Sequence, residues 1–189
     1  MSNFDSLIVG LGNPGLSEII RHNTGFLFLD HLNSKFGDGN WTDKGKYMFS
    51  HIRLGRWKVA LCKPYQNYNV SGYAVADCLK DTNLVHEQMI VVHDDVDLKL
   101  CSVRIKSGGG SGGCNGIKSI DAVLETNEYS RIRIGVGRPV VGKVTAAWVC
   151  GDFTSSDLNE MEKLYVFMDE RLENISGLDI ENLRILNKR

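Results

Sequence analysis

Two polar segments of the 189-residue sequence carry side chains suited to acid–base chemistry. His22 lies in the polar segment 21–25, and imidazole is the side chain that most often exchanges a proton near neutral pH. Asp94 follows the apolar run 89–92, which is typical of a central strand buried on both faces. A carboxylate at the end of such a strand can accept the N–H of a histidine from a neighbouring loop and stabilise the imidazolium. The two residues therefore suggest a general base that deprotonates water.

The same segments have less specific interpretations. His22 is one of five histidines, and a single histidine is more often an ordinary surface or core residue. Asp94, Asp95 and Asp97 could instead bind Mg²⁺ or Ca²⁺, or cap a turn, but their spacing lacks the defined loop of a calcium site. Metal binding is the weaker hypothesis, and we expect neither a metal nor a cofactor.

A glycine-rich turn at residues 10–15 closes the first apolar run of the chain. Its sequence, GLGNPG, satisfies the G-x-G-x-x-G pattern of dinucleotide sites, which makes an oxidoreductase one alternative. Such a site needs a long helix after the third glycine, whereas residues 16–20 form a short run that breaks at residues 23–25. A plain tight turn is the other alternative. Asn13 adds a neutral donor and acceptor at the carboxyl end of a strand, where open α/β sheets bind ligands.

A second glycine-rich segment, residues 108–113, contains five glycines and lies between a basic strand and the start of a helix. Glycines let the backbone approach a ligand closely, and a helix start offers N–H groups to a phosphate. No Gly-Lys-Ser/Thr ending follows, so the segment is not a P-loop. A flexible linker is the simpler interpretation, but Lys106 before it and Asn115 after it suit a phosphodiester.

Composition narrows the class of protein. With 22 basic and 23 acidic residues, the chain is not a uniformly basic nucleic-acid coat. Charge is nevertheless uneven, because residues 99–138 hold seven basic and three acidic residues, whereas residues 151–189 hold five and nine. Five cysteines without a C-x-x-C pair indicate a reducing, cytoplasmic environment. No apolar run approaches the ~20 residues of a membrane helix, so we expect no membrane association.

Apolar runs of strand length alternate with segments of helical period, which predicts an α/β fold. Without repeats or a linker, we expect a single domain over residues 1–189. Asn115 is expected to cap its helix, and residues 40–44 to form a loop. The expected strands are 6–11, 48–54, 57–61, 89–92, 103–106 and 132–136, and the expected helices are 26–36, 73–79, 117–124, 155–175 and 180–186.

The chain contains six motifs in order: GLGNPG at 10–15, RHNTG at 21–25, NVSG at 69–72, HDDVD at 93–97, the glycine-rich stretch 108–118 and RIRIGVG at 131–137. Taken together, these motifs resemble those of bacterial-type peptidyl-tRNA hydrolases. The resemblance implies a monomeric α/β fold in which helices surround a mixed central sheet. It also implies hydrolysis of the ester between a peptide and the 3′-terminal ribose of tRNA, with tRNA as the partner and no obligate protein partner.

The resemblance also implies roles for single residues. His22 matches the general base of the family and Asp94 its supporting carboxylate, while Asn13 matches the residue that distinguishes N-blocked from free aminoacyl-tRNA. The remaining matches are Asn69 and Asn115, which hold the acceptor end, and Lys106 and Arg133, which clamp tRNA phosphate; Asn67 is a further substrate-binding candidate.

The sequence departs from the family pattern at three places. The family has a tyrosine in the segment that corresponds to residues 16–20, where this chain has no aromatic residue. Asn67 replaces a common phenylalanine, next to Tyr68, and Cys114 replaces a histidine. A related RNA-binding protein without turnover is a second alternative function, although binding alone would not need His22 as a base.

Overall fold

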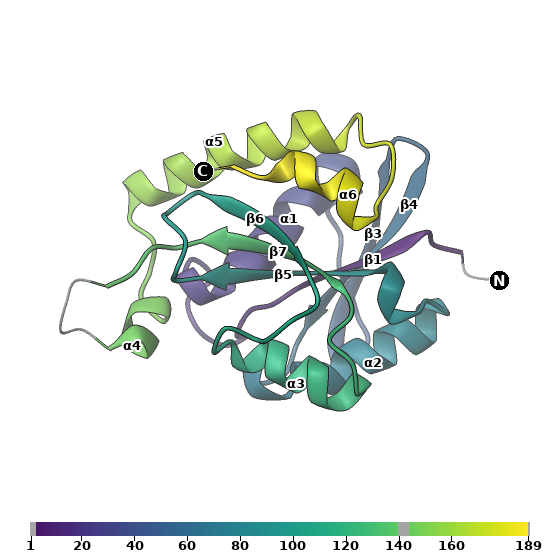
Figure 1. The fold of residues 1–189 in the computed structure, drawn as a ribbon, viewed down its shortest axis with the longest axis horizontal. Helices are drawn as coiled ribbons and strands as arrows, with labels where there is room; N and C mark the ends of the chain where they lie inside the picture. Colours follow the sequence, from purple (N-terminus) through teal and green to yellow (C-terminus); the bar gives the residue numbers. More distant parts are fainter. Residues whose placement is uncertain (1–2, 140–143, 189) are drawn as a thin grey trace.

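The molecule is built on one seven-stranded mixed sheet with helices on both faces (Figure 1). The structure, a computed structural model, describes residues 3–139 and 144–188. The predicted mixed α/β sheet is confirmed. The strands lie in the order β2 (Thr42–Asp43), β3 (Tyr47–Leu54), β4 (Trp57–Pro64), β1 (Ser6–Gly10), β5 (Met89–Asp95), β7 (Ser130–Gly135) and β6 (Val103–Ser107).

Four central strands share one direction. β1 pairs in parallel with β4 and β5, and β5 pairs in parallel with β7. The apolar run of β5 is buried throughout, as expected for a strand covered on both faces. β3 and β6 run antiparallel to their neighbours β4 and β7. The carboxyl ends of β1, β4, β5 and β7 therefore meet at one edge of the sheet.

The helices bury an apolar cluster on each face of the sheet. On one face, α1 (Thr24–Phe36) and α5 (Ser155–Leu172) pack over the sheet, with α6 (Ile180–Leu183) beside them (Figure 1). On the other face lie α2 (Ser71–Thr82) and α3 (Asn115–Leu124). Gly25 in the first turn of α1 has no room for a side chain, because a Cβ there would overlap the backbone of Leu11 and Val92. The start of α1 is thereby held against the ends of β1 and β5.

The chain leaves neighbouring strands toward opposite faces of the sheet. β1 is followed by α1 on one face, whereas β4, which pairs with β1, is followed by α2 on the other face. Such a divergence opens a crevice at the carboxyl ends of the strands, where α/β proteins bind ligands. The segment between β1 and α1 contains His22, and β5 ends at Asp95, so the candidate residues gather at this crevice.

Most of the predicted elements are present, with three corrections. Residues 40–44 include the short strand β2, where we predicted only a loop. Asn115 does not cap α3, because Cys114 holds the extended N-cap conformation and Asn115 is already the first helical residue. The long helix α5 ends at Leu172, and Ile175 is buried beyond it. No helix follows Gly15 directly, which removes the main structural requirement of a dinucleotide site.

Some elements have no counterpart in the sequence analysis. The helix α4 (Thr145–Val149) and the 3-10 helices η1 (Arg21–Asn23) and η2 (Tyr68–Val70) are too short to give a periodic pattern. The domain boundaries 1–189 stay a prediction, and residues 1–2, 140–143 and 189 lie outside the described residues. Within the described part, none of the helices has the length and apolar character needed to span a membrane.

Candidate active site

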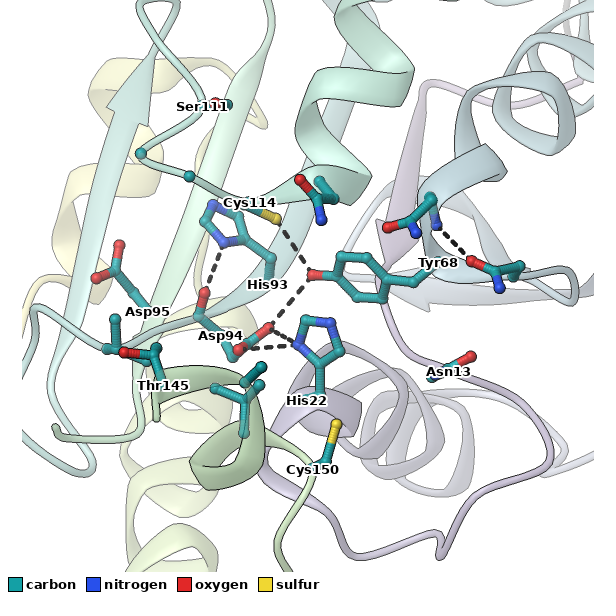
Figure 2. A pocket seen from close by; sticks show the side chains of 18 residues that line it. Asn13, His22, Tyr68, His93, Asp94, Asp95, Ser111, Cys114, Thr145 and Cys150 are labelled. Atoms are coloured by element: carbon teal, nitrogen blue, oxygen red, sulfur yellow. Dashed lines mark hydrogen bonds and ion pairs between the residues drawn. The ribbon is translucent and has the colours of Figure 1, made fainter. Parts of the chain in front are cut away.

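His22 and Asp94 meet at the carboxyl edge of the sheet although they lie 72 positions apart in the chain (Figure 2). The Nδ1 atom of His22 lies 3.0 and 3.1 Å from the two carboxylate oxygens of Asp94. A carboxylate only accepts hydrogen bonds, so Nδ1–H is the donor and Nε2 keeps its lone pair. A neutral imidazole in this tautomer is ready to accept a proton at Nε2, while the carboxylate stabilises the imidazolium that results.

The residues on either side of His22 fix the short helix η1 in place. Arg21 is buried, and its Nη1 donates to the carbonyl oxygens of Gly151 at 3.1 Å and Asp152 at 2.8 Å. Its guanidinium also lies 3.9 Å from the ring centre of Trp148. On the other side, Asn23 Oδ1 accepts a 2.6 Å hydrogen bond from the backbone N–H of Asn13. These contacts hold the backbone of η1 and thereby fix the place from which the His22 side chain extends.

Asp94 is the acidic residue at the end of β5 that contacts His22. His93, next to it, is buried, and its Nδ1 donates to the Asp94 carbonyl oxygen at 2.8 Å. Burial lowers the pKa of His93, which keeps this second imidazole neutral. Asp95 pairs with Arg133 and Asp97 with Arg138. Among residues 3–139 and 144–188, no group of three or more His, Cys, Asp or Glu side chains is arranged to hold a metal ion.

A cavity of about 530 Å³ opens beside the two residues. His22 and Asp94 line it together with four asparagines, Asn13, Asn67, Asn69 and Asn115. Asn13 lies in the loop after β1, Asn67 and Asn69 lie between β4 and α2, and Asn115 is the first residue of α3. Their amides offer uncharged donors and acceptors to a ligand in the cavity. The structure therefore brings together six of the eight site residues that we predicted.

Asn67 has a structural partner as well as a place in the cavity. Its Oδ1 accepts a 3.0 Å hydrogen bond from the backbone N–H of Asn69 and thereby caps η2. Its side-chain NH₂ group remains available as a donor. Asn115 is the first residue inside α3 and not its N-cap, and it lines the cavity.

The glycine-rich segment crosses from one edge of the sheet to the other. β6 runs antiparallel to β7, so residues 108–114 must return the chain to the edge where α3 begins. Arg131 is buried and donates to the carbonyl oxygens of Gly110 at 3.1 Å and Gly109 at 3.0 Å. Ser111, Gly112 and Gly113 then line the cavity. The segment is thus an anchored wall of the site.

The two basic residues predicted to clamp phosphate lie outside the cavity lining. Arg133 donates from Nε to Asp95 Oδ2 at 2.7 Å. Lys106, on the neighbouring strand β6, donates to the Gly110 carbonyl oxygen at 3.3 Å. Both residues are partly exposed. They lie beside the cavity on the antiparallel pair β6 and β7.

The sequence analysis names Tyr68 only as the neighbour of Asn67 and misses its contact with His22, and it misses the wall formed by α4. Tyr68 lies between two of the asparagines in the chain, and its ring stacks on His22 with the ring centres 3.8 Å apart. An aromatic residue between two amides next to a strand end is the signal that could have identified it. Thr145, Ala146, Val149 and Cys150 form a further wall from α4, for which the sequence gives no comparable signal.

The chain is similar to known proteins over most of its length. Residues 7–186 match the family model described as Peptidyl-tRNA hydrolase. A peptidyl-tRNA hydrolase of Thermotoga petrophila is 42% identical over 170 residues, which cover 89% of each chain. The same-named protein of Borrelia garinii subsp. bavariensis is 38% identical over 177 residues, 93% of this chain and 95% of the relative.

Solved structures show the same architecture. A crystal structure of a peptidyl-tRNA hydrolase in complex with N-propanol superimposes with a TM-score of 0.84 at 29% identity, covering 96% of this chain and 94% of the other. The peptidyl-tRNA hydrolase of Acinetobacter baumannii gives a TM-score of 0.82 at 29% identity, covering 99% and 96% of the two chains. By sequence and by fold, the chain belongs to the peptidyl-tRNA hydrolase family.

Proposed function

We propose that this protein hydrolyses the ester bond between the peptide and the 3′-terminal ribose of peptidyl-tRNA, releasing peptide and tRNA. The observation that carries the proposal is the contact between His22 Nδ1 and the Asp94 carboxylate at 3.0 Å, on the wall of a cavity lined by four asparagines. Family membership supports the same substrate, because the relatives are named peptidyl-tRNA hydrolases.

His22 acts as the general base in this proposal. Its Nε2 takes a proton from a water molecule as the water oxygen attacks the ester carbonyl carbon. Asp94 accepts the N–H of the imidazolium and stabilises its charge. When the tetrahedral intermediate collapses, the bond to the ribose 3′ oxygen breaks and the imidazolium returns the proton to that oxygen. Water is consumed, and a tRNA hydroxyl and the carboxylic acid of the peptide are formed; the acid then releases its proton to solvent and becomes a carboxylate.

The asparagines supply binding and charge stabilisation. An amide N–H near the ester stabilises the oxyanion of the intermediate, and losing one such donor typically costs ~10²–10³-fold in rate. We assign Asn69 and Asn115 to the acceptor end of the tRNA and Asn13 to the discrimination of N-blocked from free aminoacyl groups. Asn67 adds a donor for the substrate. Uncharged amides pair with backbone and ribose, so they do not select among amino-acid side chains.

Basic residues beside the cavity bind the body of the tRNA in this proposal. We assign Lys106 and Arg133 to phosphate contacts, which their partial exposure on β6 and β7 supports. We further propose that the protein acts as a monomer, as the family resemblance implies. Since the substrate arises in translation, we place the activity in the cytoplasm.

The decisive experiment compares two substrates. N-acetyl-aminoacyl-tRNA and free aminoacyl-tRNA are incubated separately with the protein in the presence of EDTA, and release of tRNA is followed. We expect rapid cleavage of the N-acetylated substrate only, with no effect of the chelator. Equal cleavage of both substrates would contradict the role of Asn13, and loss of activity with EDTA would contradict a reaction based on His22 alone. Binding of the tRNA without cleavage would identify an RNA-binding protein.

A further inference from the structure

Tyr68 contacts both members of the His22–Asp94 pair and is only 3% exposed. Its ring is nearly parallel to the His22 ring, at 22° and a centroid distance of 3.8 Å. Its hydroxyl lies 3.3 Å from Asp94 Oδ1, the same oxygen that lies 3.0 Å from His22 Nδ1. Figure 2 shows the hydroxyl between the Asp94 carboxylate and the sulfur of Cys114. One side chain therefore contacts the base and its supporting carboxylate at the same time.

The directions of these hydrogen bonds follow from the available protons. Burial raises the pKa of Tyr68 well above its usual value and raises the pKa of Cys114 to about 11, so both groups are protonated at neutral pH. Asp94 can only accept, so the Tyr68 O–H donates to Oδ1. With that proton used, the Cys114 S–H donates to the tyrosine oxygen, which lies 3.2 Å from the sulfur. Asp94 Oδ1 thus accepts from both His22 and Tyr68, and Cys114 in turn donates to the Tyr68 hydroxyl.

The surrounding chain leaves the Tyr68 ring little freedom to move. Gly116 in the first turn of α3 packs against the ring, and a Cβ at that position would lie 2.7 Å from the Tyr68 Cε1 atom. The Tyr68 backbone is fixed as well, because its carbonyl oxygen accepts from Ser71 Oγ at 2.9 Å. The ring is thus clamped between α3 and the imidazole.

We propose that Tyr68 is a positioning residue for the His22–Asp94 pair: its ring holds the imidazole plane and covers one face, while its hydroxyl holds Asp94 Oδ1. This inference rests on the proposed function, in which His22 is the base. A covered imidazole has fewer orientations, so Nε2 stays directed into the cavity. A donor to Oδ1 also draws negative charge away from the His22 side of the carboxylate, which favours the neutral base.

The test uses two substitutions at Tyr68 and one matched control. Tyr68→Phe keeps the ring and removes the hydroxyl, whereas Tyr68→Leu removes both. Tyr47→Phe is the control, because Tyr47 is equally buried and its hydroxyl donates to Asp81 at 2.6 Å, away from the cavity. For each variant, kcat, KM and the pH profile of kcat are measured with N-acetyl-aminoacyl-tRNA, and the folded fraction is measured in parallel.

We expect Tyr68→Phe to lower kcat about tenfold, since one hydrogen bond to a charged group is lost. Tyr68→Leu should lower kcat further, by roughly 10²-fold, because the ring orientation is lost as well. KM should change little in both. The acid side of the pH profile should move to higher pH, because a more exposed imidazole beside a more negative carboxylate binds its proton more tightly. Tyr47→Phe should change none of these quantities.

If both Tyr68 variants keep the kcat and the pH profile of the unchanged protein per folded molecule, Tyr68 is only a packing residue and the proposal is wrong. Equal losses in the Tyr47 control would also overturn it, since the effect would then be general destabilisation.

A second measurement separates this proposal from the proposed function. The NMR titration of the His22 ring needs no substrate, and the His22 signal is identified by its absence in His22→Ala. Asp94 and Tyr68 contact His22 directly, and the other titratable groups that line the cavity with it are His93 and Asp95 of β5, Cys114 before α3 and Cys150 after α4. The titration midpoint should rise in Tyr68→Phe and stay constant in Tyr47→Phe. An unchanged midpoint in Tyr68→Phe would refute the positioning role, whereas failure of the unchanged protein to cleave its substrate would refute the proposed function alone.

Discussion

The molecule contains two histidine–aspartate pairs that resemble each other closely. His22 Nδ1 lies 3.0 Å from Asp94, and His31 Nε2 lies 2.9 Å from Asp169. The side-chain exposures are also similar, at 20% and 6% for the first pair and 25% and 8% for the second. Each histidine has a tyrosine ring beside it, Tyr68 at 3.8 Å and Tyr165 at 4.8 Å between ring centres.

The pairs differ in what surrounds them. His22 and Asp94 line the cavity with four asparagines, whereas His31 and Asp169 connect α1 to α5 and do not line it. Tyr68 donates to Asp94, while the buried hydroxyl of Tyr165 has no hydrogen-bond partner among the described residues. A histidine–aspartate contact is therefore not sufficient for a general base. A free ring nitrogen must also face a space that holds substrate and donors.

The largest expected effect comes from His22→Ala. Without the base, turnover should fall by roughly 10⁴-fold, at the upper end for general-base catalysis. Binding of tRNA should persist, because the phosphate contacts remain. Turnover is measured with N-acetyl-aminoacyl-tRNA, and binding is measured with uncharged tRNA.

His31→Ala is the matched control for His22→Ala, because it removes an imidazole with a similar partner and a similar exposure. Its turnover should equal that of the unchanged protein. A near-normal rate in His22→Ala, or a comparable loss in His31→Ala, would contradict the assignment of His22, and not His31, as the general base.

The next largest effect is expected for Asp94→Asn. The asparagine NH₂ would donate to Nδ1, which places the imidazole proton on Nε2 and removes the lone pair that accepts the proton of water. We expect a loss of roughly 10²–10³-fold in kcat with little change in KM. Asp169→Asn, which changes the second pair in the same way, should keep full kcat. Loss of kcat in both variants would contradict this distinction.

The second pair should act on stability instead. Asp169 is buried and holds the His31 ring against α5, so Asp169→Asn should lower the free energy of unfolding by about 1–2 kcal/mol. Urea unfolding at neutral pH measures this change. If Asp169→Asn leaves the unfolding midpoint unchanged, the contact between α1 and α5 is not a stabilising one.

The smallest expected effect concerns the reactivity of two thiols, those of Cys114 and Cys101. Burial raises the pKa of Cys114, which contacts Tyr68, to about 11, and it raises the pKa of Cys101, which packs against the apolar cluster that contains Tyr165, to the same value. Since only the thiolate reacts with iodoacetamide, alkylation of both should be slow at about pH 8 and rise about tenfold per pH unit above it. Peptide mass spectrometry follows each cysteine separately. Rapid alkylation of Cys114 at about pH 8 would contradict the raised pKa of its thiol.

The sequence predicts the part of the site that depends on strand order. His22 follows β1 and Asp94 lies at the carboxyl end of β5, and these two strands are parallel neighbours, so a strand-end argument is enough to expect their contact. The same strand-end argument predicts the position of Asn13, which follows β1 and lines the cavity.

What the sequence does not predict depends on packing between distant elements. Tyr68 packs between the His22 ring and Gly116 of α3, which lies 48 positions further along the chain, and α4 is too short to give a periodic pattern. His31 and Asp169 lie 138 positions apart on two different helices, and the sequence around neither residue predicts their contact. Asn115 was wrongly expected as a cap, because the extended conformation falls one residue earlier, at Cys114.

Chemical rescue tests the role of His22 most directly. In His22→Ala, imidazole in solution can enter the emptied position on the cavity wall and accept the proton of water in place of the missing ring. Cleavage of N-acetyl-aminoacyl-tRNA is measured at increasing imidazole concentration in His22→Ala and in His31→Ala. We expect saturable restoration in His22→Ala and no effect of imidazole in His31→Ala. If His22→Ala cleaves at a near-normal rate without imidazole, the base lies elsewhere and the account is wrong.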